Sequence, residues 1–135
     1  WEKKMIKYLK NVDLNLEDII LVFEKSSINR PIENKNRIKS MFDNSNLIIS
    51  AWDEDKLVGL CRAPTDFSYC SYLSDLAVDM DYQRQGIGRT MIDLVKKEIS
   101  DEVALILLSA PSSMSFYPKV GFGKIENGFI IKREN

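Results

Sequence analysis

The segment Gln83-Arg84-Gln85-Gly86-Ile87-Gly88 joins an apolar strand-like run to an amphipathic helical run. The first N–H groups of a helix have no partner inside the helix, and the helix dipole is positive at that end. Anionic phosphates bind well at such a position. Gly86 and Gly88 keep side chains away from the backbone there, while Arg84 and Arg89 add positive charge. The residues therefore predict a phosphate-binding loop.

Two other kinds of phosphate loop fit this segment less well. The P-loop of nucleotide hydrolases requires Gly-Lys-Ser/Thr, whereas Arg89 and Thr90 follow Gly88 here. The dinucleotide-binding fingerprint requires a third glycine where this chain has Met91, and an acidic residue after the next strand, where residues 109–111 supply none. A nucleotide-binding domain is thus a weaker alternative. A glycine turn that only starts a helix is another alternative.

The composition excludes several classes of site. The 135 residues, of which 44% are hydrophobic and 29% charged, suit one domain spanning 1–135. The net charge of −1 argues against a nucleic-acid partner, and no polybasic stretch indicates a membrane surface. The absence of histidine excludes imidazole-based triads and histidine-ligated metals. Cys61 and Cys70 fit no zinc pattern, so we expect two reduced thiols in strands and no metal site.

Membrane insertion and secretion are also not indicated. The longest apolar run, residues 103–108, is far shorter than the roughly 20 residues that a spanning helix needs. Residues 1–5 do not resemble the apolar region of a signal peptide. We therefore expect a cytoplasmic protein.

The elements around the loop alternate between helix and strand. Helical spacing of apolar residues predicts helices after Asn15, from Pro31 to Phe42, and from the glycine loop to Ile99. The predicted strands cover residues 5–9, 47–52, 56–62, 69–78 and 103–108, the last one buried on both faces. A short helix over 112–120 and two closing strands, 122–125 and 129–132, around a turn at Asn127-Gly128 complete the order. This order predicts a mixed α/β sheet covered by helices, with a right-handed parallel crossover at its centre.

With these elements in place, the sequence resembles the GNAT superfamily of N-acetyltransferases. The family pattern is Gln/Arg-x-x-Gly-x-Gly/Ala, and Gln83, Gly86 and Gly88 occupy its three specified places. Residues 72–78 are similar to the family's fourth strand, and residues 116–122, Phe-Tyr-Pro-Lys-Val-Gly-Phe, to its tyrosine-bearing segment. The likeness covers about residues 46–132 and agrees with the first 45 residues only in the order of elements.

The resemblance implies the fold of acyl-CoA N-acyltransferases, in which the sheet is split between its fourth and fifth strands and flanked by helices. Acetyl-CoA would lie in the split, between strands ending near Val78 and Leu108. Relatives often carry an asparagine where this chain reads Ala-Pro-Ser-Ser at 110–113, so Ser112 or Ser113 is expected to supply that contact. The coenzyme-binding residues implied are Leu76, Ala77, Val78, Gln83, Arg84, Gln85, Gly86, Ile87, Gly88, Arg89, Thr90 and Ser112.

The resemblance also implies the reaction. Tyr117 matches the family's usual general acid, beside the coenzyme sulfur, although a core aromatic between Phe116 and Phe122 is the structural alternative. Asp75, one residue before Leu76 on the split strand, is a candidate base, and a hydrogen-bonded or substrate-orienting carboxylate is its alternative. The implied activity moves an acetyl group from acetyl-CoA directly to a primary amine of a small molecule or peptide, in a ternary complex. A homodimer through the C-terminal strands is a possible assembly. A non-catalytic coenzyme A sensor or interaction module is the alternative function.

Overall fold

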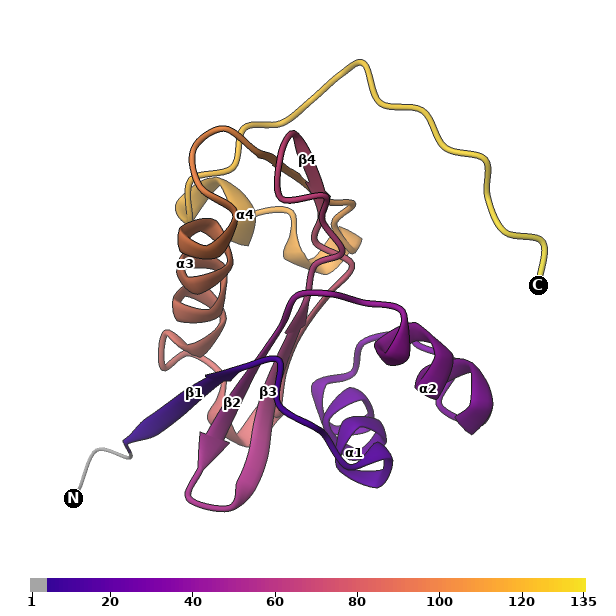
Figure 1. The fold of residues 1–135 in the computed structure, drawn as a ribbon, viewed down its shortest axis with the longest axis vertical. Coiled ribbons are helices and arrows are strands. Elements are labelled where there is room, and N and C mark those ends of the chain that lie inside the picture. The colour runs from indigo at the N-terminus through magenta and orange to yellow at the C-terminus, as the bar shows by residue number, and fades with distance from the viewer. Residues whose placement is uncertain (1–4) are drawn as a thin grey trace.

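The computed structural model describes residues 5–135 as one mixed set of strands covered by helices. A four-stranded antiparallel sheet has the spatial order β1 (Ile6–Lys10), β2 (Ile48–Asp53), β3 (Lys56–Arg62) and β5 (Asp75–Val78) (Figure 1). A second sheet pairs β4 (Cys70–Tyr72) in parallel with β6 (Ala104–Ile106). The helices are α1 (Leu16–Ser26), α2 (Lys35–Asp43), α3 (Ile87–Ile99) and α4 (Phe116–Lys119), with 3-10 turns η1 (Met80–Tyr82) and η2 (Pro111–Ser113).

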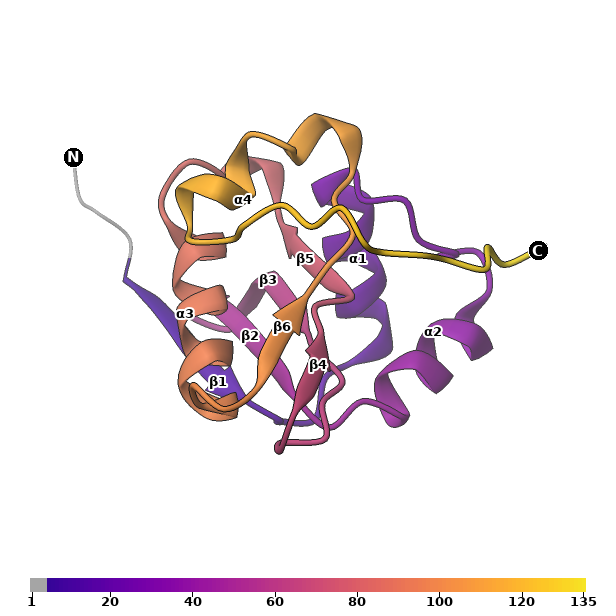
Figure 2. The ribbon, with the colours of Figure 1, turned by 90° about the horizontal axis from the view of Figure 1, so that it is seen from above.

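The helices cover the two faces of the sheet. Seen from above, α1 and α2 lie on one side of the strands and α3 on the other (Figure 2). Each side has its own apolar cluster, one under α1 and α2 around Phe23, the other under α3 around Met91. The predicted helical stripe of α3 is confirmed, because Ile87, Met91, Ile92, Val95 and Ile99 are all buried. None of the helices within residues 5–135 combines the length and the apolar character that crossing a bilayer requires.

Local capping explains where the first two helices begin. The Asn15 side chain accepts a hydrogen bond from the N–H of Glu17 at 2.8 Å, as expected of the N-cap of α1. Asn34 caps α2 in the same way, accepting from the N–H of Arg37 at 3.1 Å. The second helix therefore begins at Lys35 and not at Pro31, the start that the sequence pattern predicts.

The predicted strand over 69–78 is two strands, because the chain changes partner in its middle. The N–H of Leu73 donates to the carbonyl of Ile106 at 2.8 Å, and the next N–H, that of Ser74, donates to the carbonyl of Arg62 at 2.9 Å. The first half therefore belongs to the parallel pair and the second half to the antiparallel sheet. Alternation of apolar residues does not reveal such a change of partner.

Three further expectations were wrong. The strand over residues 103–108, predicted to be buried on both faces, is exposed on one face, since Ile106 is 43% and Leu108 61% exposed. The helix predicted over 112–120 is interrupted and forms η2 and α4. Residues 122–125 and 129–132 form no strands, and after Ile125 the chain runs extended and away from the sheet (Figure 1). Both thiols are free and lie in strands as expected, Cys61 buried and Cys70 exposed.

Candidate active site

The parallel pair β4–β6 ends at the point where a ligand would have to enter. Tyr72 lies opposite Ile106, and the last backbone bond between the two segments comes from Leu73. Beyond this point β5 pairs only with β3, while residues 107–109 have no strand partner within residues 5–135. The strands therefore separate here, which is the split expected of the fold.

Backbone groups of two β5 residues face the split. Asp79 donates its N–H to a β3 carbonyl at 2.9 Å, and Ala77 lies opposite Leu60. Opposed residues in an antiparallel ladder alternate between hydrogen-bonded and unbonded pairs. The N–H and C=O groups of Leu76 and Val78 therefore point away from β3, toward the split, as the resemblance implied.

Ala77, another predicted coenzyme contact, has different surroundings from Leu76 and Val78. Its backbone belongs to the register with β3, and its side chain is 2% exposed in the apolar cluster under α1 and α2. Successive side chains of a strand point to opposite faces of the sheet, so Ala77 cannot share the surroundings of Leu76 and Val78. The structure places it away from the split.

The glycine loop ends at the start of α3 without a side-chain cap. Gly86 is the N-cap in a left-handed conformation, with φ of 82°, and no side chain within residues 5–135 bonds to the first N–H groups of the helix. Arg84 is also left-handed, with φ of 65°, so the loop turns tightly before the helix. The Gln83 side chain donates to the carbonyl of Val78 at 2.8 Å and ties the loop to the end of β5. Uncapped N–H groups at a helix start are suited to an anion.

Gly88 lies where β5, α3 and α4 meet. A β-carbon at this position would lie 3.6 Å from Phe116, 3.7 Å from Leu76 and 4.0 Å from Val78, which are ordinary van der Waals distances. Arg89 adds a second link between the helices, because its Nη2 donates to the last carbonyl of α4 at 3.3 Å. The missing side chain of Gly88 therefore leaves room beside the inner face of β5.

The remaining predicted coenzyme contacts differ in their surroundings. Thr90 donates its hydroxyl to the carbonyl of Gly86 at 2.9 Å and stabilises the first turn of α3. The Ile87 side chain is buried in the core, so only its backbone faces the loop. Gln85 is exposed on the loop. Ser112 is exposed on η2, and no hydrogen bond within residues 5–135 ties it to the loop.

Tyr117 is held on α4 by two aromatic neighbours. Its ring makes edge contacts with Phe116 and Phe122, at centroid distances of 5.2 and 5.5 Å. Burial raises the pKa of the Tyr117 hydroxyl, the field of Cys61 raises it further, and the positive charge of Arg30 opposes both. The hydroxyl therefore keeps its proton at neutral pH and is available as a donor.

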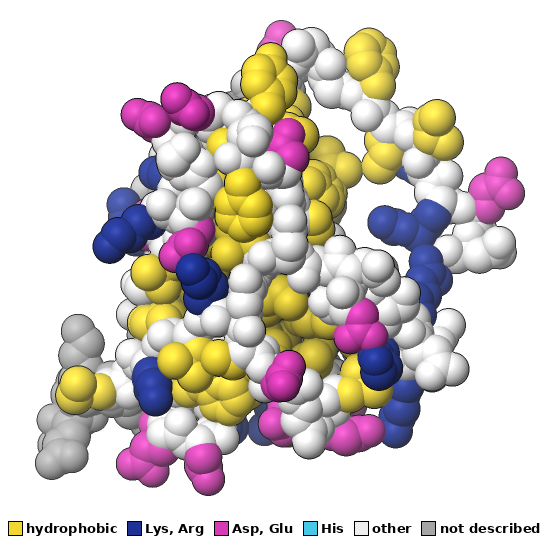
Figure 3. Space-filling view, viewed as in Figure 1, with side chains coloured by type: hydrophobic (Ala, Val, Ile, Leu, Met, Phe, Trp, Pro, Cys, Tyr) yellow, Lys and Arg dark blue, Asp and Glu magenta, His cyan; other side chains and the backbone are white. Residues whose placement is uncertain are grey.

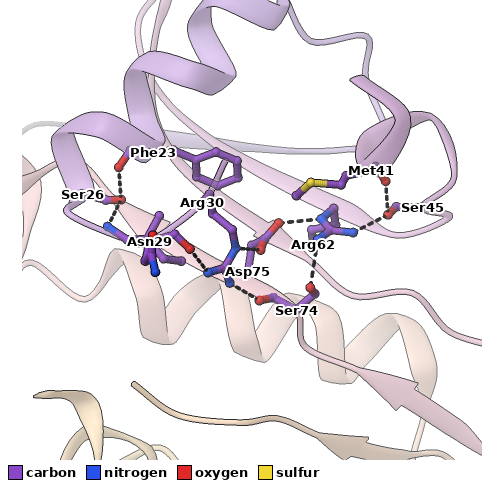
Figure 4. Close-up of polar contacts among 10 residues, drawn as sticks. Phe23, Ser26, Asn29, Arg30, Met41, Ser45, Arg62, Ser74 and Asp75 are labelled. Atoms are coloured by element: carbon purple, nitrogen blue, oxygen red, sulfur yellow. Dashed lines mark hydrogen bonds and ion pairs between the residues drawn. The ribbon is translucent and has the colours of Figure 1, made fainter. Parts of the chain in front are cut away.

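Asp75 sits between two arginines, neither of which belongs to a motif in the sequence. Its Oδ1 accepts from Nε of Arg30 at 2.6 Å, and its Oδ2 accepts from Nε of Arg62 at 2.5 Å (Figure 4). Arg30 also donates to the carbonyl of Ser74 at 2.6 Å, and Arg62 to the hydroxyls of Ser74 and Ser45. The network joins the α1–α2 connection, β3, β5 and the end of α2.

This environment favours the structural alternative for Asp75. The residue is 0% exposed and both oxygens are bound, so an amine would have to displace a guanidinium to reach it. A buried carboxylate of this kind is stabilised by its paired charges. A signal in the sequence was present but weak: Arg62 ends an apolar strand, and Arg30 precedes a proline in a connection.

Residues 15–132 match the model of the acetyltransferase (GNAT) domain family. The chain belongs to the GNAT acetyltransferases. An uncharacterized N-acetyltransferase ycf52 of Pyropia yezoensis is 31% identical over an alignment of 134 residues that covers 94% of this chain and 75% of the relative.

Solved structures of other GNAT acetyltransferases have the same fold. A probable acetyltransferase of Staphylococcus aureus superposes with a TM-score of 0.81 at 22% identity, covering 96% of this chain and all of the other. The PaiA N-acetyltransferase of Thermoplasma acidophilum, solved in complex with coenzyme A, superposes with a TM-score of 0.71 at 21% identity, covering 93% of both chains. At these identities the likeness establishes the fold.

Proposed function

We propose that this GNAT acetyltransferase moves an acetyl group from acetyl-CoA to a primary amine of a small molecule or peptide, by direct transfer in a ternary complex. One observation carries the proposal. The β4–β6 pairing stops where the inward backbone groups of Leu76 and Val78 lie close to the uncapped start of α3. A ligand with an amide-bearing arm and a pyrophosphate needs both features together.

In this proposal the coenzyme follows β5 toward the helix. Its pantetheine amides would bond to the backbone of Leu76 and Val78, as an added strand does. Its pyrophosphate would accept from the N–H groups at residues 86–89, with Arg84 and Arg89 supplying charge. Gly88 leaves the space through which the chain of the coenzyme passes. The coenzyme A complex of the Thermoplasma acidophilum neighbour supports this choice of ligand.

The chain's own residues then account for the chemistry. The neutral amine attacks the thioester carbonyl, and a tetrahedral intermediate with a negative oxygen forms. A β5 N–H that faces the split and is not bonded to the pantetheine arm would stabilise that oxygen. When the C–S bond breaks, Tyr117 gives its proton to the sulfur, and solvent returns a proton to the phenolate. The amine's own proton leaves to water, since Asp75 is closed off by its two arginines.

The acceptor would enter beside the loop that precedes β4. Phe67, Tyr69 and Tyr72 are exposed here, with relative exposures of 47%, 79% and 40%. Aromatic faces attract cationic groups, and the Asp66 carboxylate at the base of this loop is ionised at neutral pH. We therefore propose a cationic amine as the acceptor class.

Two measurements test the proposal. Calorimetry with acetyl-CoA should show one binding site per chain. A panel of polyamines, aminoglycosides, amino acids and peptides, read by release of free thiol, should show turnover on cationic amines. No binding of acetyl-CoA would refute the proposal at its base. Binding with no turnover on any amine would support the sensor alternative, and turnover only on uncharged or acidic amines would refute the acceptor class.

A further inference from the structure

The network around Asp75 holds more positive than negative charge. Two arginines share the one carboxylate, Arg30 at its Oδ1 and Arg62 at its Oδ2. Within residues 5–135 neither arginine forms an ion pair with any other carboxylate. The further side-chain partners of Arg62 are the neutral hydroxyls of Ser45 and Ser74. One positive charge in a largely buried cluster is therefore not balanced, although buried charges are normally paired.

The unbalanced charge is accessible on Arg30. Its side chain is 24% exposed, against 9% for Arg62. A guanidinium has five N–H donors. Three protein oxygens accept from Arg30, namely Oδ1 of Asp75 and the carbonyls of Ser74 and Asn29, at 2.6, 2.6 and 2.7 Å (Figure 4). Arg30 is thus fixed in position, and two of its N–H groups are left for an acceptor from outside residues 5–135.

Arg30 lies at the point where the strands separate. The Ser74 carbonyl that it binds comes directly after Leu73, whose N–H makes the last bond to β6. The proton donor is also within its field, because the positive charge of Arg30 opposes the rise in the pKa of the Tyr117 hydroxyl. A group bound to Arg30 would therefore lie beside the mouth of the split.

An exposed apolar surface adjoins Arg30. Tyr72 and Ile106 are opposite one another in the β4–β6 register, and they are 40% and 43% exposed. Their neighbours Leu73 and Leu105 pack in the cluster under α3. Since side chains alternate between the faces of a sheet, Tyr72 and Ile106 face the side of α1 and α2, where Arg30 lies. Apolar side chains are visible between the β4 region and these two helices (Figure 3).

We propose that Arg30 binds the carboxylate of the acceptor, and that the acceptor is an α-amino acid with a cationic side chain. A planar guanidinium is well suited to a carboxylate. With the carboxylate at Arg30, the α-amine one carbon away is held at the mouth of the split and is the nitrogen that receives the acetyl group. The side chain of the acceptor would extend over Tyr72 and Ile106 toward the loop before β4, where Asp66 is ionised. This inference rests on the proposed function and narrows its acceptor class.

Lysine and cadaverine form a matched pair, because cadaverine is lysine without its carboxylate. The unaltered protein should acetylate lysine with a kcat/KM about 10- to 100-fold higher than that for cadaverine, as expected when a charged hydrogen bond is lost. The product should be Nα-acetyllysine, identified by mass spectrometry of its fragments. Equal use of the two amines, or acetylation of lysine at its side-chain nitrogen, would overturn the inference while leaving acetyl transfer established.

Substitution of Arg30 tests the residue itself. Arg30→Met leaves Asp75 and Arg62 as a one-to-one pair, and circular dichroism should show a folded protein. Its kcat/KM for lysine should fall to that for cadaverine, whereas cadaverine should be used as before, and Arg30→Lys should restore part of the difference. The control is Arg37→Met, since Arg37 is exposed on α2 and its side chain makes no hydrogen bond within residues 5–135. A loss that is equal for both amines in Arg30→Met would show a merely structural role and overturn the inference.

Calorimetry separates this inference from the proposed function. Lysine is titrated into the protein saturated with coenzyme A, where no acetyl group can be transferred. Its affinity should fall about tenfold or more in Arg30→Met and stay unchanged in Arg37→Met. Lysine affinity that does not depend on Arg30 would overturn the carboxylate site even if cationic amines are acetylated. Failure of the protein to bind acetyl-CoA would instead refute the proposed function.

Discussion

Arg62 of β3 and Asp75 of β5 are opposite one another in the sheet register, and their side chains meet at 2.5 Å in the interior. Asp75 has no exposed surface and Arg62 is 8% exposed, so water does not screen the pair. Arg30 approaches the other oxygen of Asp75 at 2.6 Å from the α1–α2 connection. One carboxylate of β5 therefore holds together β3 and the α1–α2 connection.

Replacing Asp75 by alanine should destabilise the protein strongly. The substitution leaves Arg62 buried without its counter-charge, and breaking such a pair costs about 3–5 kcal/mol. Urea denaturation followed by circular dichroism measures the change. The matched control is Glu17→Ala, which removes an exposed ion pair with Lys35 at 3.0 Å and should change the free energy of unfolding by less than about 1 kcal/mol. Equal losses for both variants would show that the network is not a structural anchor.

Replacing Tyr117 by phenylalanine should lower kcat by about 10²–10⁴-fold, the usual contribution of a positioned proton donor. The affinity for acetyl-CoA should stay within a few-fold, because the ring and its two edge contacts are retained. Tyr8→Phe is the control, since Tyr8 lies on β1 and is remote in the sheet order from β5. An unchanged kcat would mean that water protonates the sulfur.

The value of kcat should also not fall near the ordinary pKa of tyrosine, because Tyr117 keeps its proton there. Burial, aided by the field of Cys61, raises the pKa of this hydroxyl, so the donor form persists above the usual value of about 10. A profile of kcat against pH, measured with saturating substrates, should therefore stay level from neutral pH to about pH 10. A fall in kcat well below that pH, absent in Y117F, would contradict the assignment.

Gly88→Ala should separate stability from coenzyme binding. Its β-carbon would find only ordinary contacts in the protein, and alanine is favoured over glycine in a helix by up to about 1 kcal/mol. The variant should thus be as stable as the parent or more so, while its affinity for acetyl-CoA falls about tenfold or more because the methyl group takes space beside Leu76 and Val78. Thermal unfolding and calorimetry measure the two effects. Gly123→Ala, in open space, should leave acetyl-CoA binding unchanged; unaltered binding in G88A would place the ligand elsewhere.

The loop before β4 should lose its order only in strong acid. Asp66 accepts N–H bonds from Tyr69, Ser68 and Cys70 at 2.7, 2.8 and 3.1 Å, and these lower its pKa from 3.8 to about 2. A depressed pKa means that this stabilisation is complete above pH 3.8 and is lost as the pH falls through about 2. In hydrogen exchange, the protection factors of the amides of residues 68–70 should stay constant above pH 3.8. Asp66→Ala should lose that protection at every pH. Protection factors in the parent that do not fall as the pH drops to about 2 would disprove the cause.

Several features followed from local patterns. The helix from Ile87 to Ile99 was correctly predicted because its apolar residues recur at helical spacing. The hairpin of β2 and β3 was predicted from two apolar runs around a short polar turn. Gly86, at the N-cap of α3, and the resemblance to the GNAT family pointed to the same loop. These features depend on neighbours within a few residues, so the sequence displays them directly.

Other features depend on contacts between distant residues. Asp75 looked like a candidate base until the fold brought Arg30 and Arg62 against it, from 45 and 13 positions away. Ala77 lies one residue from two groups that face the split, yet the register with β3 turns it away. These pairings leave at most a weak local trace in the chain, because each is set by partners far apart in sequence.

By itself, the sequence determined the glycine loop, the helix that begins there, the family and the tyrosine of α4. The reason is that the conformational freedom of glycine, the spacing of apolar residues and the spacing of motifs are properties of short segments. Only the tertiary structure decided where the strand over 69–78 changes partner, which carboxylate is closed off, and that the tail after Ile125 leaves the sheet. The physical reason is that hydrogen-bonding edges and buried charges are satisfied by whatever the fold brings near them. A strand, a carboxylate or a tail therefore acquires its role from its partners.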